Sequence, residues 1–394
     1  MNMKNALDEI LADGVKRGHA PGVLALVADR DGILYEGSAG ERQLGGGAAM
    51  GPDTVLWIAS MTKAITSVAA IQCVERGLLN LDAPASRVVP AIGALGVLTG
   101  FDAQGQPITR PPKRPITLRH LLSHNSGCSY EIWNPDMQKV QAALGIPGTI
   151  DCRLKALELP LVADPGERWE YGIGIDWAGR MVEAVTGLTL GEFMHQNLWG
   201  PLGMTSTGFH ITPDMRQRLA GVHLRGEDGA FASFPFEITQ EPEFHMGGGA
   251  LYSTAGDYAR FMRMVLNLGQ LDGERVLKPE TVVSHLMLNQ IGNARVSLLK
   301  AAIALTADAE FFPGLRKTWS LAFQINEEEA PTGRPAGSLS WAGLANSFFW
   351  IDPHTGIAGL LATQTFPFAD ARVMDLLYAY EKGVYDALRR TRKG

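Results

Sequence analysis

The sequence predicts an α+β fold. One antiparallel sheet is expected to be built from both termini and flanked by helices, with an inserted, mostly helical region between its two halves. Three observations predict this fold. Each end of the chain carries the pattern of a β-hairpin, each end also carries the pattern of an amphipathic helix, and the apolar residues between them recur mainly at helical spacing.

The first elements expected are a helix and a hairpin. Residues 6–17 place apolar side chains at helical spacing, and Pro21-Gly22 breaks that pattern. The apolar run 23–27 is typical of a buried strand. Asp31-Gly32 is a turn signal, and the returning strand starts at residues 33–35.

The last elements mirror the first. Residues 347–351 and 357–363 are two apolar strand patterns, and the segment 352–356 between them reads Asp-Pro-His-Thr-Gly, a turn signal. A terminal helix is expected over residues 371–390. Because both ends supply a hairpin and a helix, we expect the two hairpins to share one sheet.

The chain between the hairpins is expected to be an insertion and not a separate tandem domain. We therefore expect residues 1–394 to form a single unit, with a sheet subdomain of about residues 1–80 and 245–394 and a helical subdomain of about residues 81–244. Residues 97–115 contain four prolines and few apolar residues after Phe101, which indicates a long loop. No internal repeat is present, so solenoids and propellers are excluded.

Composition excludes several classes of protein. Of the 394 residues 46% are hydrophobic and 19% charged, which is a globular composition, and the net charge of −6 argues against a nucleic-acid partner. No apolar stretch is long enough to span a membrane. The three cysteines, Cys73, Cys128 and Cys152, have neither disulfide-framework nor zinc-site spacing, so we expect buried free thiols. With no signal-peptide pattern at the N-terminus, a cytoplasmic location is expected.

The residues with the clearest chemical potential are Ser60 and Lys63 in the tetrad Ser-Met-Thr-Lys. On a helix, residues i and i+3 share one face, so the lysine can reach the serine hydroxyl and accept its proton if burial keeps the amine neutral. The tetrad alone is weak evidence, because Ser297 and Lys300 form a second match in the same chain.

Context separates the two tetrads. Ser60 follows a strand-like apolar run and precedes residues 64–74, which are apolar on nearly all sides and so predict a buried helix. At the start of such a helix, backbone N–H groups and the positive end of the helix dipole favour a developing oxyanion. Ser297 has no such setting. The alternative for Ser60 is a helix N-cap, a position that serine favours in any case.

Three further segments could contribute to a site. Tyr171 follows the Pro165-Gly166 turn, Trp341-Ala342-Gly343 enters the C-terminal strand region, and Gly247-Gly248-Gly249 allows close approach to the backbone. Taken singly, each has an ordinary structural explanation: a packed tyrosine, a strand end and a glycine-rich turn.

Together and in this order, these segments resemble the serine penicillin-recognising superfamily, and most of all the class C β-lactamase-like esterases known as family VIII carboxylesterases. The resemblance runs from about residue 6 to 385 and includes residues 116–127 (Ile-Thr-Leu-Arg-His-Leu-Leu-Ser-His-Asn-Ser-Gly), the Pro-Gly-x-x-Trp-x-Tyr run, and residues 201–204 and 248–255. It implies a β-lactamase/penicillin-binding-protein-like fold forming a single catalytic unit.

The resemblance also implies roles for individual residues. Ser60 would be the acyl-accepting nucleophile, Lys63 its partner in proton transfer and Tyr171, the tyrosine of the family's YxN motif, the general base. The backbone N–H groups of Ser60 and Leu344 would form the oxyanion hole. His120 and His124 belong to a structural signature and are expected to be hydrogen-bond-satisfied scaffold residues. No metal and no cofactor are implied.

Two departures from the β-lactamase pattern bear on the substrate. Ile173 replaces the Asn of YxN, and Trp341 replaces the Lys of the Lys-Thr-Gly motif, which removes a cation suited to a β-lactam carboxylate. We assign substrate binding to Trp341, Ala342, Gly343 and Ile173. Neutral esters are the better-matched substrates.

The function predicted from the sequence is therefore a serine carboxylesterase that hydrolyses neutral short-chain carboxylic esters through an acyl-enzyme on Ser60. The alternatives are an acyltransferase of the same family, a β-lactamase or D-amino-peptidase, and, from a different class, a non-catalytic scaffold with the same fold. The expected partner is a small-molecule ester, with no nucleic acid and no membrane, and the oligomeric state is left open.

Overall fold

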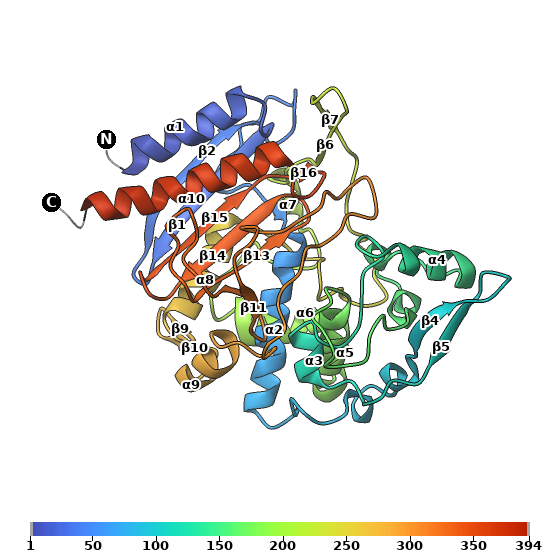
Figure 1. The fold of residues 1–394 in the computed structure, drawn as a ribbon. Coiled ribbons are helices and arrows are strands. Elements are labelled where there is room, and N and C mark those ends of the chain that lie inside the picture. Colours follow the sequence, from blue (N-terminus) through green and yellow to red (C-terminus); the bar gives the residue numbers. More distant parts are fainter. Residues whose placement is uncertain (1–2, 392–394) are drawn as a thin grey trace.

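The structure is a computed structural model and describes residues 3–391. Its centre is a seven-stranded antiparallel sheet in the order β11-β12-β13-β14-β15-β1-β2 (Figure 1). The strands are β1 (Gly22–Asp29), β2 (Ile33–Gly40), β11 (Lys317–Trp319), β12 (Gln324–Asn326), β13 (Ser338–Gly343), β14 (Ser347–Asp352) and β15 (Ile357–Ala362). The N-terminal hairpin joins the C-terminal one through β1 and β15, which confirms the predicted α+β sheet built from both ends.

Two turns fix the register of these hairpins. In the first, the Asp29 carboxylate accepts the N–H groups of Asp31 and Gly32, both over 2.8 Å. In the second, the Asp352 carboxylate accepts the N–H of Thr355 over 2.9 Å. Aspartate is a turn signal because its short side chain can bind the backbone two or three residues further along the chain.

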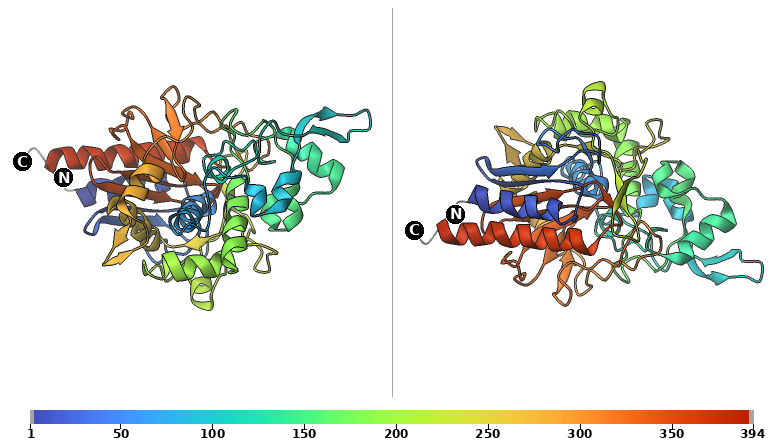
Figure 2. Two further views of the ribbon diagram at one scale, coloured as in Figure 1. Left: turned by 90° about the horizontal axis from the view of Figure 1, so that it is seen from below. Right: turned by 90° about the horizontal axis from the view of Figure 1, so that it is seen from above.

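Helices cover both faces of the sheet. The helices are α1 (Met3–Lys16), α2 (Thr62–Glu75), α3 (Leu118–Leu122), α4 (Pro135–Leu144), α5 (Gly174–Thr186), α6 (Leu190–Met194), α7 (Pro213–Gln217), α8 (Ala255–Leu266), α9 (Pro279–Thr281) and α10 (Ala371–Thr391). α1 and α10 lie side by side on one face, and α8 packs on β1, β14 and β15 from the other (Figures 1 and 2). Because both faces are covered, residues 22–28 of β1 are all buried.

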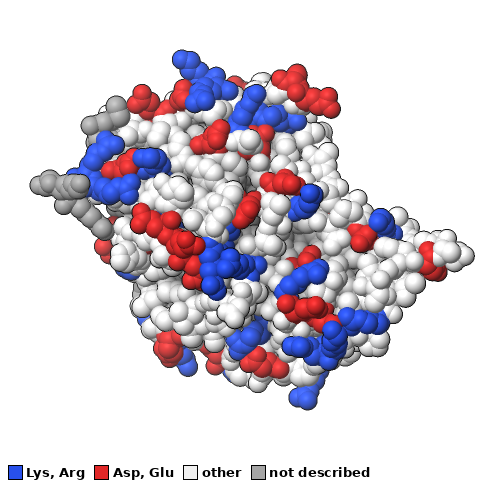
Figure 3. Space-filling model, in the orientation of Figure 1, with Lys and Arg blue, Asp and Glu red and all other residues white. Residues whose placement is uncertain are grey.

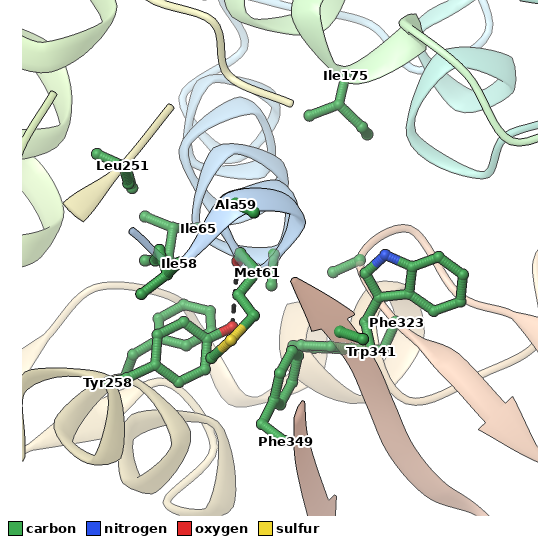
Figure 4. Close-up of a cluster of buried hydrophobic side chains, with 14 of the residues drawn as sticks. Ile58, Ala59, Met61, Ile65, Ile175, Leu251, Tyr258, Phe323, Trp341 and Phe349 are labelled. Atoms are coloured by element: carbon green, nitrogen blue, oxygen red, sulfur yellow. Dashed lines mark hydrogen bonds between the residues drawn. The ribbon is translucent and has the colours of Figure 1, made fainter. Parts of the chain in front are cut away.

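α2 lies between the sheet and the mostly helical region, where it contacts α5 and α6 (Figure 1). Its side chains from Thr62 to Cys73 are all buried, as its apolar pattern predicts. Figure 4 shows how its first turn is held: Met61 points down onto aromatic rings, and the Tyr258 hydroxyl donates to the Met61 carbonyl over 3.1 Å. The start of α2 is therefore fixed from below by the sheet side of the molecule.

The short strands form small sheets around this centre. They are β3 (Leu56–Trp57), β4 (Val97–Phe101), β5 (Pro107–Arg110), β6 (His223–Arg225), β7 (Phe231–Ser233), β8 (Tyr252–Ser253), β9 (Gln270–Leu271), β10 (Glu274–Arg275) and β16 (Thr365–Phe366). The antiparallel pair β3–β8 lies directly before the predicted nucleophile and links it to the glycine-rich segment 247–249.

One predicted element is wrong. The segment 97–115, expected to be a long loop, contains the hairpin β4–β5. The Asp102 carboxylate closes its turn by accepting the N–H groups of Gln104 and Gln106, and Pro107 occupies the first position of β5, where proline is tolerated. Only Val97 of the two strands is buried, and the other residues are half-buried or exposed, so the strands lack the alternating apolar pattern that signals one buried face.

The three cysteines are buried and free, as expected. Within residues 3–391, no helix has the length and apolar character needed to cross a membrane.

Candidate active site

The structure brings the predicted serine and lysine into contact. Ser60 lies in a 3₁₀ turn, Ala59–Met61, directly before α2, and Lys63 lies in the first turn of α2. Lys63 Nζ donates to Ser60 Oγ over 3.0 Å and to the Gly248 carbonyl over 2.6 Å. Ser60 is not an N-cap, because the cap position of α2 is taken by Met61 and no capping side chain is present. The hydroxyl is therefore available for chemistry.

Lys63 is buried, and its amine has a lowered pKa. Only 1% of the residue is exposed, and burial lowers the pKa of its amine, while the negative charge of Asp176 opposes that shift. A lowered pKa increases the fraction of neutral amine near neutral pH. The lone pair of that amine can take the Ser60 proton across the 3.0 Å contact.

Tyr171 completes the predicted trio. Its oxygen accepts the indole N–H of Trp341 over 3.0 Å and is hydrogen-bonded to Ser60, and its ring lies 4.7 Å from Lys63 Nζ. Burial raises the pKa of the phenol, although the bonds from Ser60 and Trp341 oppose that rise. The neutral phenol is therefore the resting form, and Lys63 is the better proton acceptor of the two at neutral pH.

The cluster contains two residues that the sequence reasoning missed. Asp176, in the first turn of α5, is fully buried; its carboxylate accepts the Gly248 N–H over 2.8 Å and the Tyr130 hydroxyl over 3.4 Å. The Tyr130 ring lies 4.9 Å from Lys63 Nζ. An aspartate at the start of a helix is common because it suits the helix dipole, so the pattern gave no separate signal for Asp176.

A cavity opens beside Ser60. Its volume is about 170 Å³, and its wall is mostly aromatic and aliphatic. The lining residues are Trp57, Ala59, Ser60, Tyr130, Glu131, Ile132, Trp133, Thr149, Ile150, Tyr171, Phe236, Met246, Gly248, Gly249, Leu299, Ile303, Leu305, Trp341, Ala342, Leu344, Phe366 and Phe368. Five of the predicted site residues are among them: Ser60, Tyr171, Trp341, Ala342 and Leu344.

Two residues assigned to substrate binding do not line this cavity. Ile173 is 1% exposed and caps the start of α5, where its carbonyl accepts the N–H of Asp176. Gly343 ends β13 beside the turn that carries Ser60, and a Cβ there would lie 2.4 Å from the Ile58 carbonyl oxygen. Both are packing residues: Gly343 is small so that β13 can approach the backbone next to Ser60.

The two histidines of the structural signature differ. His120 Nδ1 accepts the N–H of Thr117 over 3.3 Å within a capping box, so it is satisfied as expected. For His124 the prediction of a hydrogen-bond-satisfied residue is wrong. It is buried among Trp169, Tyr171 and Trp319, and neither ring nitrogen has a hydrogen-bond partner in the described chain. Burial and the charge of Lys63 hold the pKa of His124 well below its usual range, so the ring is neutral.

No group of three or more metal-binding side chains occurs in the part of the chain that the structure describes. The site residues instead form a serine–lysine–tyrosine cluster at the mouth of an apolar cavity, set where a buried helix meets the edge of β13. That arrangement, on a sheet built from both ends of the chain, is typical of enzymes that form an acyl-enzyme on serine.

Comparison with known proteins agrees with this class. The model of the family described as β-lactamase matches residues 7–382, and the chain belongs to that family. Lovastatin esterase of Penicillium rubens is 33% identical over 96% of this chain and 98% of its own length. Monacolin J acid methylbutanoyltransferase of Aspergillus terreus is 33% identical over 84% of this chain and 82% of its own length.

Solved structures give the same result. A mutant of the simvastatin synthase LovD of Aspergillus terreus superimposes with a TM-score of 0.82 at 30% identity, over 98% of this chain and 95% of that one. Fold and family thus place the chain in the serine penicillin-recognising superfamily, with the chemistry of a serine hydrolase or acyltransferase.

Proposed function

We propose that this protein is a serine carboxylesterase that cleaves neutral carboxylic esters, including short-chain aryl esters, through an acyl-enzyme on Ser60. The observation that carries the proposal is the composition of the cavity wall around the serine. Among the described residues its one charged lining side chain is Glu131, whose carboxylate accepts the N–H and hydroxyl of Thr149 over 2.9 and 3.0 Å. Within residues 3–391, no lysine or arginine lines the wall to receive a substrate carboxylate.

Trp341 supports the same choice of substrate. It stands where β-lactamases carry a lysine, and its indole N–H is already committed to Tyr171. Its ring adds apolar surface to the wall. An apolar cavity with few polar groups favours the alkyl or aryl part of a neutral ester over an anionic antibiotic.

The proposed reaction begins with transfer of the Ser60 proton to Lys63, with Tyr171 hydrogen-bonded to the same oxygen. Ser60 Oγ bonds to the ester carbonyl carbon, and the backbone N–H groups of Ser60 and Leu344 receive the developing oxyanion. The ester C–O bond then breaks, and the departing alkoxide takes the proton from the Lys63 ammonium. Water repeats the sequence on the acyl-enzyme and releases the acid.

Acyl transfer is the second candidate. A wall this apolar holds few waters, so an alcohol bound in the cavity can intercept the acyl group before water does. Relatives named as acyltransferases and as an esterase share this family, which favours testing both outcomes. The small-molecule partner, the absence of nucleic-acid and membrane partners, and the cytoplasmic location stay predictions from the sequence.

A substrate panel tests the proposal. p-Nitrophenyl butyrate should exceed benzylpenicillin in kcat/KM by roughly ten- to 150-fold, the effect of the one charge-assisted hydrogen bond that is lost where Trp341 replaces a lysine. Nitrocefin, a reactive cephalosporin, should open only slowly. Adding a neutral alcohol and measuring the new ester against free acid separates transfer from hydrolysis. Equal kcat/KM for the penicillin and the ester would restore the β-lactamase alternative.

A further inference from the structure

Asp176 occupies an unusual position for a carboxylate. It is 0% exposed, and it is the one carboxylate among the described residues whose charge acts on the pKa of Lys63. It is not part of the predicted trio and does not line the cavity. A buried charge needs a partner or hydrogen bonds to be tolerated, so its contacts indicate what holds it there.

One residue, Gly248, connects Asp176 to Lys63 through its backbone N–H and carbonyl groups. The Gly248 N–H donates to Asp176 Oδ1 over 2.8 Å, while the Gly248 carbonyl accepts from Lys63 Nζ over 2.6 Å. The absence of a side chain at Gly248 is essential to this arrangement. A Cβ would lie 2.6 Å from Asp176 Oδ2 and 2.7 Å from the Tyr130 hydroxyl. The glycine-rich segment thus binds the carboxylate and the amine through the two backbone polar groups of a single residue.

The position of Asp176 also bears on the replacement of the family's Asn by Ile173. The family pattern has an amide at position 173, but here Ile173 occupies the N-cap position of α5, and its apolar side chain is buried and does not line the cavity. Asp176 lies three residues later, in the first turn of the same helix, on a neighbouring row of side chains. The polar group next to the lysine therefore comes from one turn further along the chain.

We propose that Asp176 is a positioning residue that acts through Lys63: it is the counter-charge that stabilises the ammonium formed when Lys63 accepts the Ser60 proton, and with Gly248 it fixes the orientation of that amine. The inference rests on the acyl-enzyme chemistry proposed above. It predicts that Asp176 affects the chemical step and the pH range of activity more than the binding of the ester.

The other groups around Lys63 leave this role to Asp176. Burial raises the pKa of the phenols of Tyr130 and Tyr171 and lowers the pKa of His124, so all three are neutral near neutral pH. Near Asp176, burial raises the pKa of the Cys128 and Cys152 thiols to about 12, so they also carry no charge. No other anion described in the structure compensates the ammonium.

The test is the pH dependence of kcat and kcat/KM of the Asp176→Asn variant. This substitution keeps the shape of the side chain and removes its negative charge. We expect kcat for p-nitrophenyl butyrate to fall about ten- to 150-fold, the effect of losing one charge-assisted contact, with KM changed much less. The acid limb of the profile, where kcat/KM falls as the pH is lowered, should move to lower pH by about one unit or more. A nearby carboxylate raises the pKa of an amine, so removing the charge of Asp176 lowers the pKa of Lys63.

Asp257→Asn is the matched control. Asp257 is also a buried aspartate in the first turn of a helix, α8, where it accepts from Ser206 and Thr207, and it has no part in the pKa shift of Lys63. Its loss should affect stability while leaving the acid limb in place. If Asp176→Asn keeps the wild-type limb, moves it upward, or moves it no more than Asp257→Asn does, the inference is wrong.

Two further measurements keep the test decisive. If Asp176→Asn does not fold, Tyr130→Phe replaces it: losing a hydrogen bond to the carboxylate should shift the limb in the same direction by less, and an unmoved limb counts against the inference. If the wild type neither cleaves esters nor is labelled at Ser60, the proposed function has failed. An NMR titration of Lys63 in wild type and Asp176→Asn then still decides whether the two charges are coupled.

Discussion

The chain contains the tetrad Ser-x-x-Lys twice, and the two copies differ in burial and in backbone conformation. In the tetrad at 60–63, the serine precedes a buried helix, and the lysine is 1% exposed and 3.0 Å from the serine oxygen. In the tetrad at 297–300, Ser297 and Lys300 are both exposed and the backbone is not helical. Its contribution to the site is Leu299, which lines the cavity.

The difference shows that burial and helical backbone, and not the spacing alone, bring the serine and the lysine together and lower the pKa of the lysine. The Ser-x-x-Lys spacing places the two side chains within reach of each other only if the backbone is helical. The pKa of the lysine is lowered only if water is excluded from its amine. The first tetrad meets both conditions because α2 is enclosed by the sheet side and by α5 and α6. The second meets neither and supplies a piece of apolar wall instead.

The most direct test of the difference between the two tetrads is to replace each serine in turn by alanine. Ser60→Ala should abolish covalent labelling by a fluorophosphonate and ester turnover with it, because no other hydroxyl in the site is paired with a buried amine. Ser297→Ala should be labelled like the wild type. Mass spectrometry of the labelled peptide checks the assignment, and a label on Ser297 would refute it.

The next largest effect is expected for the two side chains that contact the Ser60 oxygen. Lys63→Ala and Tyr171→Phe should each lower kcat by about 10²- to 10⁴-fold, the usual contribution of a group positioned for proton transfer, whereas Lys300→Ala should not change it. Because Lys63 and Tyr171 both contact Ser60, the double variant should lose far less than the product of the single losses. Full additivity in steady-state kinetics would show that the two do not share one network.

The pH dependence sharpens the comparison further. Burial lowers the pKa of Lys63 below its ordinary 10.5, so the neutral amine accumulates as the pH rises through that lowered pKa. Below it, kcat/KM should fall about tenfold per pH unit, since one proton inactivates the base. Lys300→Ala should keep this limb. A profile that stays flat through the acidic range, measured where the fold is intact by circular dichroism, would contradict a lysine base.

A smaller effect is expected from the indole that holds Tyr171. Trp341→Phe keeps a ring in the wall but loses the N–H donated to the phenol oxygen, a bond worth about 1 kcal/mol, or roughly fivefold in kcat. Trp350→Phe is the control, because that indole N–H is buried in the sheet without a partner. Equal effects of the two substitutions on kcat would remove Trp341 from the network.

The smallest effect should come from the second tetrad itself. Leu299→Ala removes apolar wall, so KM for a bulky aryl ester should rise a few-fold while kcat is retained, as expected for contacts made equally in ground and transition states. Leu298→Ala, at a 46% exposed neighbour, should leave both constants unchanged. A fall in kcat with Leu299→Ala would mean that this segment takes part in the chemistry.

The sequence predicted those parts of the molecule whose signals are local. The terminal hairpins carry turn residues that bind their own backbone. The segment 64–74 of α2 is apolar on nearly all sides, which is typical of an enclosed helix. The hairpin β4–β5 was missed because its exposed strands need no apolar alternation. For the site, a family resemblance located Ser60, Lys63 and Tyr171, but no local pattern could reveal Asp176.

Asp176 and Gly248 lie 72 residues apart and meet only in the folded protein. The same holds for Gly343, whose smallness is explained by a carbonyl of Ile58 that no sequence pattern places beside it. His124 shows the converse: the signature motif predicts a satisfied histidine, whereas the fold places its ring among aromatic rings with no hydrogen-bond partner. Contacts between distant segments are what the residue pattern leaves undetermined.

The pairing of β1 with β15 has a consequence for biosynthesis. β1 is an inner strand of the finished sheet, yet more than three hundred residues are translated between Asp29 and its partner Ile357. Until β15 leaves the ribosome, the nascent chain presents one whole side of an apolar strand with its backbone N–H and C=O groups unpaired. Such an edge invites pairing with other chains. Yield in the cell will therefore depend on how well chaperones shield the first forty residues during synthesis.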